Sequence, residues 1–471
     1  MRPAYFGVMT KSALHDFSPT YPAGYHDRCE QVLATALEHV DAYASLHEID
    51  PGPDHHIFDR YAALPALTKK DLREFSPAAL TPRGMNVDAG IARREIEFVQ
   101  TSGSTGDRCT NIWHQPWWDA SERASWELNA RTRETLSGGT HREAILTHPL
   151  CAGFPCNDGY LPMERRLLGR FLYLNERFDP AAWTPDLCDR MVHDLDMWKP
   201  DVLEANPSFL SRLSLHIMRK KRAFAQPKLI VLTYECPSLV QVRQIRSAFQ
   251  APVISSYGST EAGYVFMECE CGRLHQNTAF CHVDFLPFAA QHSGPASGKI
   301  LVTTFGNPWA VFVRFDIGDI VRVARDPCAC GRRDGLTIEA IEGRMANLTL
   351  TTNGRAVTQR TVDLAMASIP GIEEYELRQS TRKTYHVRFV APDRDAKAAS
   401  GEIVDSLKEI YGRDAEVRTE AAVAISLGNG VKYQLTKAEF AIDGDEFLDR
   451  RFAPERERLD RINRIMAGST G

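Results

Sequence analysis

The sequence predicts an α/β protein with a large N-terminal domain, residues 1–342, and a small C-terminal α+β domain, residues 343–471. In residues 107–250, short apolar strands alternate with helical stretches, which is typical of a largely parallel sheet covered by helices. From Val253 onward strand signals dominate and predict a β-rich subdomain. Another change near Ile341 begins a run of strands and helices of about a hundred residues, the size of a separate domain.

The expected elements follow from local signals. A helix covers residues 30–46, a short helix follows the cap residue Thr68, and a strand at 96–100 leads into a Gly/Ser/Thr-rich segment. Beyond it we expect strands at 143–147, 201–204, 228–233, 252–256, 263–269, 299–304 and 320–323, and helices at 122–134, 207–222 and 238–249. In the C-terminal domain we expect strands at 348–352, 375–377, 385–389 and 415–419, helices at 358–368 and 396–411, and a charged helical tail at 447–466.

The composition is that of a globular protein and argues against several classes. The 471 residues are 43% hydrophobic and 25% charged, and 56 Lys and Arg stand against 61 Asp and Glu, a net charge of −5. This balance argues against a dedicated nucleic-acid-binding protein. The longest apolar runs fall far short of the ~18 residues that span a bilayer, and residues 1–17 carry no secretory signal. We therefore expect neither a nucleic acid nor a membrane as a partner.

Cysteine usage predicts a reduced, cytoplasmic protein with a metal site. The 11 cysteines are an odd number, and several lie close together, which does not suit a disulfide framework. Cys269, His275, Cys328 and Cys330 supply three thiolates and one imidazole, a set that suits tetrahedral Zn²⁺ in a structural role. The spacing departs from paired C-x₂-C ligands, and Cys271 is an alternative to Cys269. Buried thiols without a metal are the other interpretation.

The segment at residues 101–106 predicts an anion-binding loop. It follows a strand, its two glycines let the backbone approach a ligand closely, and successive N–H groups in such a turn form a concavity for an anion. No Gly-Lys-Ser/Thr closes the segment, so it is not a Walker A loop. Taken alone, it is also consistent with a flexible surface turn. Its residues are Thr101, Ser102, Gly103, Ser104, Thr105 and Gly106.

Three further motifs follow this loop: SSYGSTEAG at 255–263, VRFDIGDIV at 313–321 and IEGR at 341–344. In this order and spacing, the four motifs resemble those of the adenylate-forming superfamily of acyl- and aryl-CoA ligases, carrier-loading adenylation domains and luciferases. The resemblance covers roughly residues 60–440 and is greatest to the branch of phenylacetate–CoA ligase. It implies a large ATP- and acid-binding domain followed by a small mobile domain.

The resemblance also implies roles for the first two motifs. The loop at 101–106 would hold the β- and γ-phosphates of ATP. Relatives often carry Lys directly after this loop, whereas this chain has Asp107 and Arg108, so a cation there would come from Arg108. In the second motif Thr260 would contact the α-phosphate and Glu261 would bind Mg²⁺, which prefers hard oxygen ligands. Tyr257 would lie against the adenine, with Gly258 and Ser259 in the same nucleotide-binding turn.

Later motifs would complete the nucleotide site. Asp319 matches the carboxylate that binds both ribose hydroxyls, and an ionised carboxylate accepts two O–H donors readily. Arg344 matches an arginine that contacts ribose or phosphate beside the domain hinge. Relatives usually continue with two carboxylates after this arginine. Here the positions are Ala346 and Asn347, so the usual hinge carboxylates are missing.

The acid-binding and small-domain residues are less completely specified. Relatives build the acid pocket and the adenine shelf from the regions matching 148–160 and 233–237, and the latter contains Glu235. Lys432 resembles the lysine that reaches the substrate carboxylate and the α-phosphate during adenylation. Its spacing from the preceding glycine is one residue too long, so Lys437 is a competitor.

We therefore expect an AMP-forming acyl- or aryl-CoA ligase that uses ATP, Mg²⁺ and CoA and carries a structural Zn²⁺. It would adenylate a small carboxylic acid, an aromatic one by expectation, release pyrophosphate and pass the acyl group to CoA. The alternative acceptor is a carrier protein or a small amine-type nucleophile. A non-catalytic zinc-bearing nucleotide sensor is a third hypothesis, which the intact Thr260, Glu261 and Asp319 disfavour. The residues leave the oligomeric state open, a homodimer included.

Overall fold

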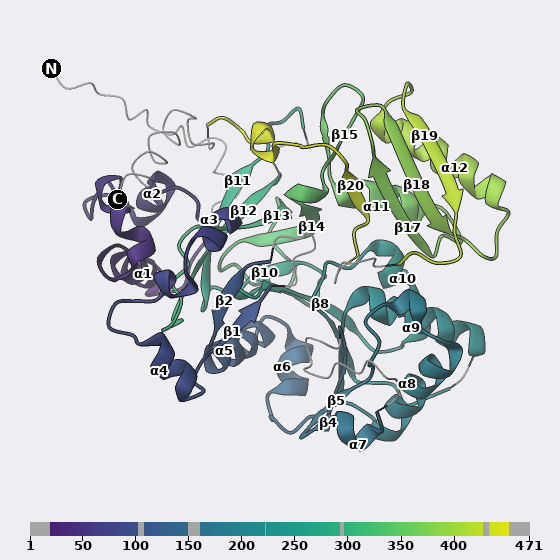
Figure 1. Cartoon of the computed structure of the whole chain (residues 1–471), viewed down its shortest axis with the longest axis horizontal. Helices are drawn as coiled ribbons and strands as arrows, with labels where there is room; N and C mark the ends of the chain where they lie inside the picture. Colours follow the sequence, from purple (N-terminus) through teal and green to yellow (C-terminus); the bar gives the residue numbers. More distant parts are fainter. Residues whose placement is uncertain are drawn as a thin grey trace.

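A twelve-stranded sheet forms the framework of the molecule, and a four-stranded sheet lies in the C-terminal region (Figure 1). The computed structural model describes residues 19–101, 108–148, 161–221, 223–292, 296–426 and 433–451. In the order of hydrogen-bonded neighbours, the large sheet runs β11-β12-β13-β14-β10-β9-β8-β7-β6-β3-β5-β4. No helix among these residues is long and apolar enough to cross a membrane.

One half of the large sheet is parallel and is covered by helices on both faces. Leu203 and Ala205 pack with α8–α10 on one face, whereas Val202 packs with α6 on the other. Burial on both faces explains why these strands are short continuous apolar runs. The strands are β3 (Glu143–Leu146), β5 (Phe171–Tyr173), β6 (Val202–Ala205), β7 (Leu229–Leu232) and the start of β8 (Val253–Ser259), with β4 (Leu167–Leu168) antiparallel at the edge. The helices are α5 (Gln115–Trp126), α6 (Ala130–Leu136), α7 (Met163–Arg166), α8 (Pro185–Trp198), α9 (Pro207–Lys220) and α10 (Leu239–Ala248).

The other half of the sheet is antiparallel, and β8 belongs to both halves. Ser255 pairs in parallel with Leu232 of β7, whereas Ser256 pairs in antiparallel fashion with Met267 of β9. Residues from β8 to β14 share one apolar core with α1 and α2 (Figure 1). These elements are β9 (Gly263–Glu268), β10 (Leu274–Gln276), β11 (Cys281–Pro287), β12 (Ser297–Thr304), β13 (Phe315–Val323), β14 (Thr337–Arg344), α1 (Tyr25–His39) and α2 (Ile57–Ala63).

The C-terminal region has a core of its own. Apolar side chains of its four-stranded sheet and two helices pack together, and Val240 of α10 joins them from the large region. The sheet order is β19-β18-β17-β20. Its elements are α11 (Gln359–Ser368), β17 (Glu374–Gln379), β18 (Thr384–Val390), α12 (Ala396–Tyr411), β19 (Glu416–Ala421) and β20 (Thr436–Ala438), preceded by the hairpin β15 (Thr349–Leu350) and β16 (Ala356–Val357).

Two expected helices are divided in the structure, each for a local reason. The helix expected at 30–46 ends at His39, because Val40 is extended, and a 3₁₀ helix, Asp41–Glu48, follows. The helix expected at 122–134 is two helices, α5 and α6. Asn129 interrupts it because its side chain accepts hydrogen bonds from the N–H groups of Arg131 and Thr132 and so caps α6.

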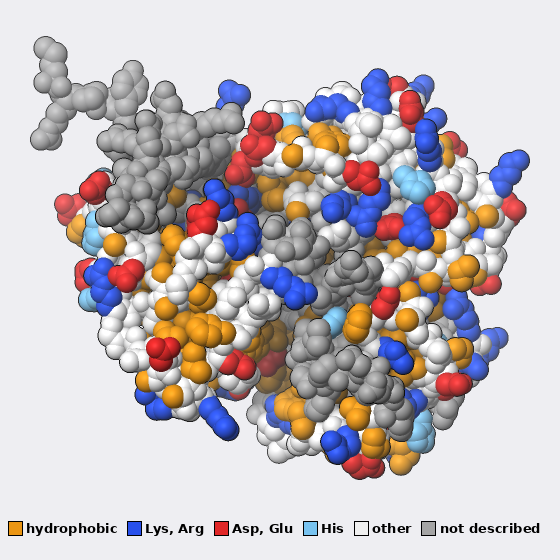
Figure 2. Space-filling view, in the orientation of Figure 1, with side chains coloured by type: hydrophobic (Ala, Val, Ile, Leu, Met, Phe, Trp, Pro, Cys, Tyr) orange, Lys and Arg blue, Asp and Glu red, His pale blue; other side chains and the backbone are white. Residues whose placement is uncertain are grey.

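The helical tail expected at 447–466 is not seen in its described part. A short 3₁₀ helix, Gly444–Phe447, ends where the tail was expected to begin, and residues 448–451 are not helical. Residues 452–471 lie outside the described residues. Basic and acidic side chains are interspersed on the face of the molecule shown in Figure 2.

The remaining α-helices and β-strands lie before α5 in the chain. They are α3 (Lys69–Glu74), α4 (Val87–Ala92), β1 (Glu97–Gln100) and β2 (Thr110–Trp113).

Candidate functional site

The second motif lies where the two halves of the large sheet meet. Tyr257, Gly258 and Ser259 end β8, and Thr260 and Glu261 form the turn into β9. A side chain at Gly258 would collide with the carbonyl of Gly263, so the tight return of the chain requires glycine there. Glu261 is 5% exposed. The turn therefore buries Glu261, whereas Ser259 and Thr260 are half-buried and Gly258 is exposed.

Tyr257, Asp319 and Arg344 meet although they come from three strands. The Tyr257 hydroxyl donates to Oδ2 of Asp319 at 2.6 Å. Arg344, which pairs with Asp319 across β13 and β14, brings its Nε to 3.4 Å from Oδ1. Burial and the neighbouring Asp319 carboxylate raise the pKa of Tyr257 well above its ordinary value, so the phenol stays a donor. The structure thus brings together three residues that the motifs predicted.

One carboxylate oxygen of Asp319 can accept a further hydrogen bond. Its side chain is buried, and Oδ1 has no hydrogen-bond partner among the described residues. Arg344 forms an ion pair with this oxygen but no hydrogen bond. A ligand hydroxyl would supply the missing hydrogen bond. This oxygen can therefore accept a hydrogen bond from the hydroxyl of a ligand.

The described ends of the predicted phosphate loop are tied together by two hydrogen bonds. The N–H of Thr101 donates to the carbonyl of Cys109 at 2.9 Å, and the N–H of Cys109 donates to Oγ1 of Thr101 at 3.0 Å. Residues 102–107, which include Ser102, Gly103, Ser104, Thr105 and Gly106, lie outside the described residues. The structure nevertheless shows where the loop begins and ends, between β1 and β2.

Cys109 follows the loop and is buried. Burial and then the charge of the Glu261 carboxylate raise the pKa of its thiol. The thiol also donates to the carbonyl of Lys69 in α3 at 3.6 Å. Sequence reasoning did not single out Cys109, and its one signal was its position shortly after the loop.

Glu235 connects the large region to the C-terminal chain. It lies after β7, where Oε1 accepts from the N–H of Ser208 at 3.0 Å and Oε2 accepts from the N–H of Tyr433 at 3.2 Å. Lys432 itself lies outside the described residues. Lys437 is exposed in β20, opposite Arg378 of β17. A role of Glu235 in holding the chain beside Lys432 was not foreseen.

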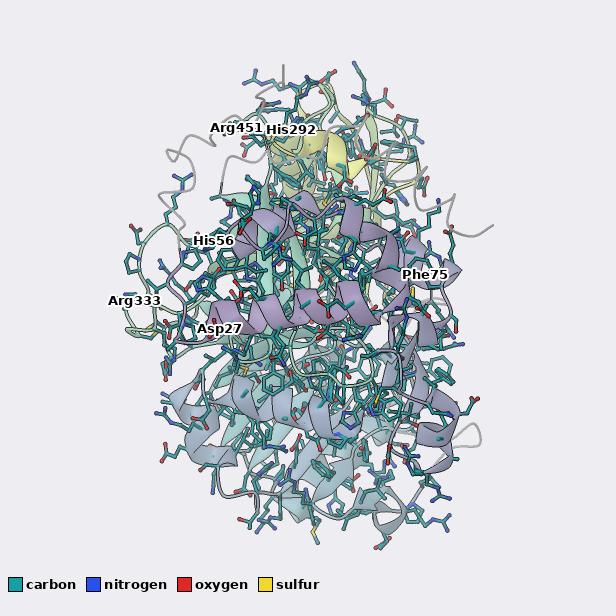
Figure 3. All side chains as sticks on the ribbon, turned by 90° about the vertical axis from the view of Figure 1, so that its left-hand side faces the viewer. Asp27, His56, Phe75, His292, Arg333 and Arg451 are labelled. Carbon is teal, nitrogen blue, oxygen red and sulfur yellow. The ribbon has the colours of Figure 1, made fainter. Side chains whose placement is uncertain are left out.

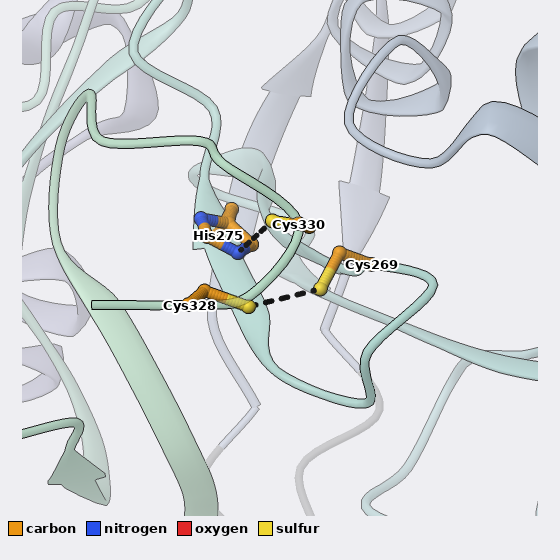
Figure 4. Close-up of side chains that lie close together, drawn as sticks. All are labelled: Cys269, His275, Cys328 and Cys330. Carbon is orange, nitrogen blue, oxygen red and sulfur yellow. Dashed lines mark hydrogen bonds between the residues drawn. The ribbon is translucent and has the colours of Figure 1, made fainter. Parts of the chain in front are cut away.

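The four predicted metal ligands converge in a small cluster (Figure 4). Their ligand atoms all lie within 4.8 Å of one another. Sγ of Cys269 is 3.6 Å from Sγ of Cys328, and Sγ of Cys330 is 3.3 Å from Nε2 of His275. At a tetrahedral centre with Zn–S bonds of about 2.3 Å, two sulfurs lie about 3.8 Å apart. The spacing therefore fits a zinc ion, whereas Cys271 is exposed and outside the cluster.

Neighbouring groups orient the cluster. Oγ1 of Thr337 lies 3.2 Å from Nδ1 of His275, which leaves Nε2 facing the sulfurs. Burial lowers the pKa of His275 to about 4, so its imidazole is neutral and able to bind a metal. Burial alone would raise the pKa of Cys330, but hydrogen bonds from Arg332 lower it overall.

Three glutamates, which sequence reasoning missed, lie between α5 and the parallel strands; Glu143 is buried, and Glu122 and Glu204 are half-buried. Burial, followed by repulsion among these carboxylates, raises the pKa of Glu122, Glu143 and Glu204 to about 8 each. The Tyr264 hydroxyl donates to Oε1 of Glu122 at 2.7 Å, and that of Tyr234 donates to Oε1 of Glu204. No sequence pattern flagged them, because their proximity depends on how α5, β3 and β6 pack.

The glutamate cluster makes stability depend on pH. The ordinary pKa of 4.5 is raised to about 8, so at intermediate pH the folded chain keeps protons that the unfolded chain has lost. The free energy of unfolding then falls by up to about 1.4 kcal/mol per pH unit for each such group. Glu204→Gln removes one of these titrating carboxyl groups and keeps an oxygen that accepts the hydrogen bond from Tyr234. We expect it to become progressively more stable than the wild type between pH 5 and pH 8 in urea denaturation.

The exposed Glu127 provides the control. The stability of Glu127→Gln relative to the wild type should stay constant over this range. If the difference between Glu204→Gln and the wild type were also constant from pH 5 to pH 8, the raised pKa would be contradicted.

Comparisons with known proteins identify the fold. No family model and no curated protein match the chain. A structure of 2-hydroxyisobutyryl-CoA ligase in the postadenylation state, in complex with 2-HIB-AMP, is 18% identical, with a TM-score of 0.63 over 96% of this chain and 94% of that one. An open conformation of that ligase with 2-HIB-AMP and CoA is 19% identical, with a TM-score of 0.54 over 90% and 93%.

The thioesterification state of that ligase, with 2-HIB-AMP and CoA, is 18% identical and gives a TM-score of 0.50 over 89% of this chain and 91% of that one. The mixed α/β fold expected from the sequence, with a large sheet and helices, is thereby confirmed, and 2-hydroxyisobutyryl-CoA ligase has a similar fold.

Proposed function

We propose that the chain is an AMP-forming acid–thiol ligase that adenylates a small carboxylic acid and passes the acyl group to CoA. The observation that carries this proposal is the buried Asp319 carboxylate. It is held by Tyr257 and approached by Arg344, and one oxygen lacks a hydrogen-bond partner among the described residues. Its partner Tyr257 belongs to the same motif as Thr260 and Glu261 of the β8–β9 turn. The shared fold and the motif resemblance support the same proposal.

The proposed reaction has two displacement steps. An oxygen of the substrate carboxylate attacks the α-phosphorus of ATP, and the bond to pyrophosphate breaks. The thiolate sulfur of CoA then attacks the acyl carbon, and AMP leaves with the oxygen that had joined them. The protein contributes mainly positioning and charge stabilisation.

The residues divide these tasks. Asp319 accepts hydrogen bonds from the ribose hydroxyls, and Arg344 contacts the ribose or a phosphate. The Thr260 hydroxyl donates a hydrogen bond to the α-phosphate. The loop at 101–106 holds the β- and γ-phosphates, and Glu235 lies at the adenine side. Glu261 supplies a carboxylate oxygen for Mg²⁺, which offsets the phosphate charge when bound.

The substrate class, the acceptor and the domain division belong to the same proposal. We propose an aromatic or heteroaromatic acid as substrate and CoA as acceptor, with a carrier protein or a small amine as the alternative acceptor. Residues 343–471 would act as a small domain that moves between the half-reactions, and the reduced thiols suit the cytoplasm. The separate core of the C-terminal region supports the domain division.

A structural zinc is part of the proposal. Cys269, His275, Cys328 and Cys330 would hold it, because their number, chemistry and spacing suit a filled tetrahedral shell. The ion would join the β9–β10 turn to the loop before β14 and so support the antiparallel half of the sheet.

Carboxylate-dependent exchange of labelled pyrophosphate into ATP tests the proposed function. We expect a panel of carboxylic acids to give exchange with at least one aromatic member, and mass spectrometry to find its thioester when CoA is added. Products formed only with a carrier protein or an amine would select the alternative acceptor. Absence of exchange with every acid would contradict the function itself.

Lysine variants test the division of labour between the two domains. If Lys432 meets the α-phosphate and the substrate carboxylate only during adenylation, Lys432→Ala should lose most pyrophosphate exchange. It should still convert a supplied acyl-adenylate to thioester at a near-normal rate, because a flexible ammonium can serve one state and leave in the next.

The companion variant is Lys437→Ala, which removes an exposed lysine of β20. A selective defect in Lys437→Ala instead would move the role to that residue. Full exchange activity in both variants would mean that the C-terminal domain supplies no catalytic cation.

A further inference from the structure

The chain crosses between the large sheet and the C-terminal domain twice. It leaves at the end of β14 through a 3₁₀ turn, Met345–Asn347. It returns after β20, and residues 443–449, here called the strap, lie against β11 (Figure 1). The C-terminal domain is therefore attached to the large sheet at both of its ends.

The strap adds to the free edge of the large sheet. β11 is the last strand on its side of the sheet. The N–H of Ala289 donates to the carbonyl of Phe447, and the N–H of Asp449 donates to the carbonyl of Pro287, both at 2.8 Å. Phe288 and Leu448 form an antiparallel bridge between them. The strap thus pairs with the end of β11 and the two residues after it through backbone hydrogen bonds.

A separate apolar cluster anchors the strap. Phe447 and Leu448 are buried, and the ring of His292 lies 4.7 Å from that of Phe447. Figure 3 shows His292 and Arg451 at the same end of the molecule. The cluster joins the large sheet, the outward crossing and the strap, through Phe288, Ile320, Leu348, Leu350, Ala356, Phe447 and Leu448.

One ion pair connects the strap to the interior. Lys299 is 6% exposed, and its Nζ lies 2.7 Å from Asp316 of β13 and 2.8 Å from Asp445 of the strap. Burial alone would lower the pKa of Lys299, but these two carboxylates raise it overall, so the ammonium stays charged. The Asp445 side chain is 61% exposed, so this partner is the one that solvent can reach.

The strap also lies on the outward crossing. A side chain at Gly444 would collide with the end of the Met345 side chain, so the returning chain passes directly against the residue after Arg344. The opposite side of the C-terminal domain has separate contacts with the large region. There the N–H of Leu239 donates to Oδ2 of Asp363 at 2.7 Å, and Arg243 donates to the carbonyl of Ala367 at 2.8 Å.

We propose that the strap is a latch that fixes the orientation of the C-terminal domain, and that its contact through Asp445 must open before that domain can turn. Ala438 and Gly444 are six residues apart, so the connecting chain spans at most about 20 Å. A larger displacement of β20 from β11 requires the strap to detach. A latch of this kind explains why the domain can be held without the usual hinge carboxylates, which Ala346 and Asn347 replace.

Hydrogen exchange measured by mass spectrometry on the full chain tests the latch. Asp445→Ala removes the exposed partner of Lys299 and leaves the backbone intact. We expect the peptides containing Ala289 and Asp449 to exchange about tenfold faster, the effect of losing one charge-assisted hydrogen bond. The peptide containing Leu239 should also exchange faster, because its N–H donates to Asp363 of the C-terminal domain. Glu446→Ala, at the exposed neighbouring position, should change neither.

The Leu239 peptide decides between a latch and a local contact. Faster exchange near the strap alone, or no change at all, would overturn the proposal. Phe447→Ala removes the apolar anchor and should produce the same paired change more strongly, with the β6 peptide as an unchanged reference. An unaffected Leu239 peptide in that variant would also overturn the latch. The measurement needs no substrate, so its outcome is independent of the proposed ligase activity.

Discussion

Asp319→Ala should lower carboxylate-dependent ATP–pyrophosphate exchange by about 10²–10³-fold, the usual effect of losing one well-placed charge stabiliser. The variant loses the acceptor for the Tyr257 hydroxyl and the partner of Arg344, as well as the oxygen that we assign to the ribose. The residue lies in the middle of β13, where the strand pairs through its backbone and not through this side chain, so the fold should survive, which circular dichroism and thermal unfolding check. Exchange rates at saturating acid and varied ATP measure the effect.

Two variants serve as controls for Asp319→Ala. Tyr257→Phe keeps the ring and removes only the bond to Asp319, so we expect a smaller loss. Glu339→Ala changes an exposed carboxylate on β14 and should leave exchange unchanged. Near-wild-type exchange in Asp319→Ala would contradict the assigned nucleotide contacts.

Cys328→Ser should release the metal and lower the melting temperature by at least about 5 °C. Structural zinc contributes of order 10 kcal/mol in small zinc-binding peptides, and less where a large core shares the stabilisation. Metal analysis of the purified wild type should find about one zinc per chain. Prolonged treatment with a strong chelator should reproduce the destabilisation of the variant.

Cys271→Ser is the matched control, because Cys271 is an exposed cysteine two residues from Cys269. It should keep both the zinc and the melting temperature of the wild type. Absence of zinc from protein produced with zinc present would contradict the site. Loss of zinc from Cys271→Ser alone would replace Cys269 by Cys271 in the ligand set.

Local sequence signals predicted much of the fold. The bounds of α12 agree with the expected helix at 396–411, and α11 begins one residue after its expected start, where Thr358 caps it. Errors occurred where a single side chain interrupts a periodic pattern, as Asn129 does between α5 and α6. Polar residues that bond their own backbone compete with helix continuation, and the period of apolar residues does not reveal this.

The candidate site was predicted in its residues but not in its contacts. β8 and β13 are separated in the sheet by β9, β10 and β14, so no strand pattern could predict that the Tyr257 hydroxyl reaches Asp319. The strap was missed for a related reason. Residues 447–466 were expected to form a charged helical tail, whereas Phe447 and Leu448 are buried by contact with Phe288, far away in sequence.

Isotope transfer from the acid tests the central claim most directly. An acid that supports exchange is supplied with both carboxylate oxygens labelled with ¹⁸O, together with ATP and CoA, and the products are analysed by mass spectrometry. If the carboxylate attacks the α-phosphorus, one labelled oxygen must appear in AMP and none in pyrophosphate. Formation of ADP with the label in inorganic phosphate, or of AMP without label, would contradict an acyl-adenylate intermediate.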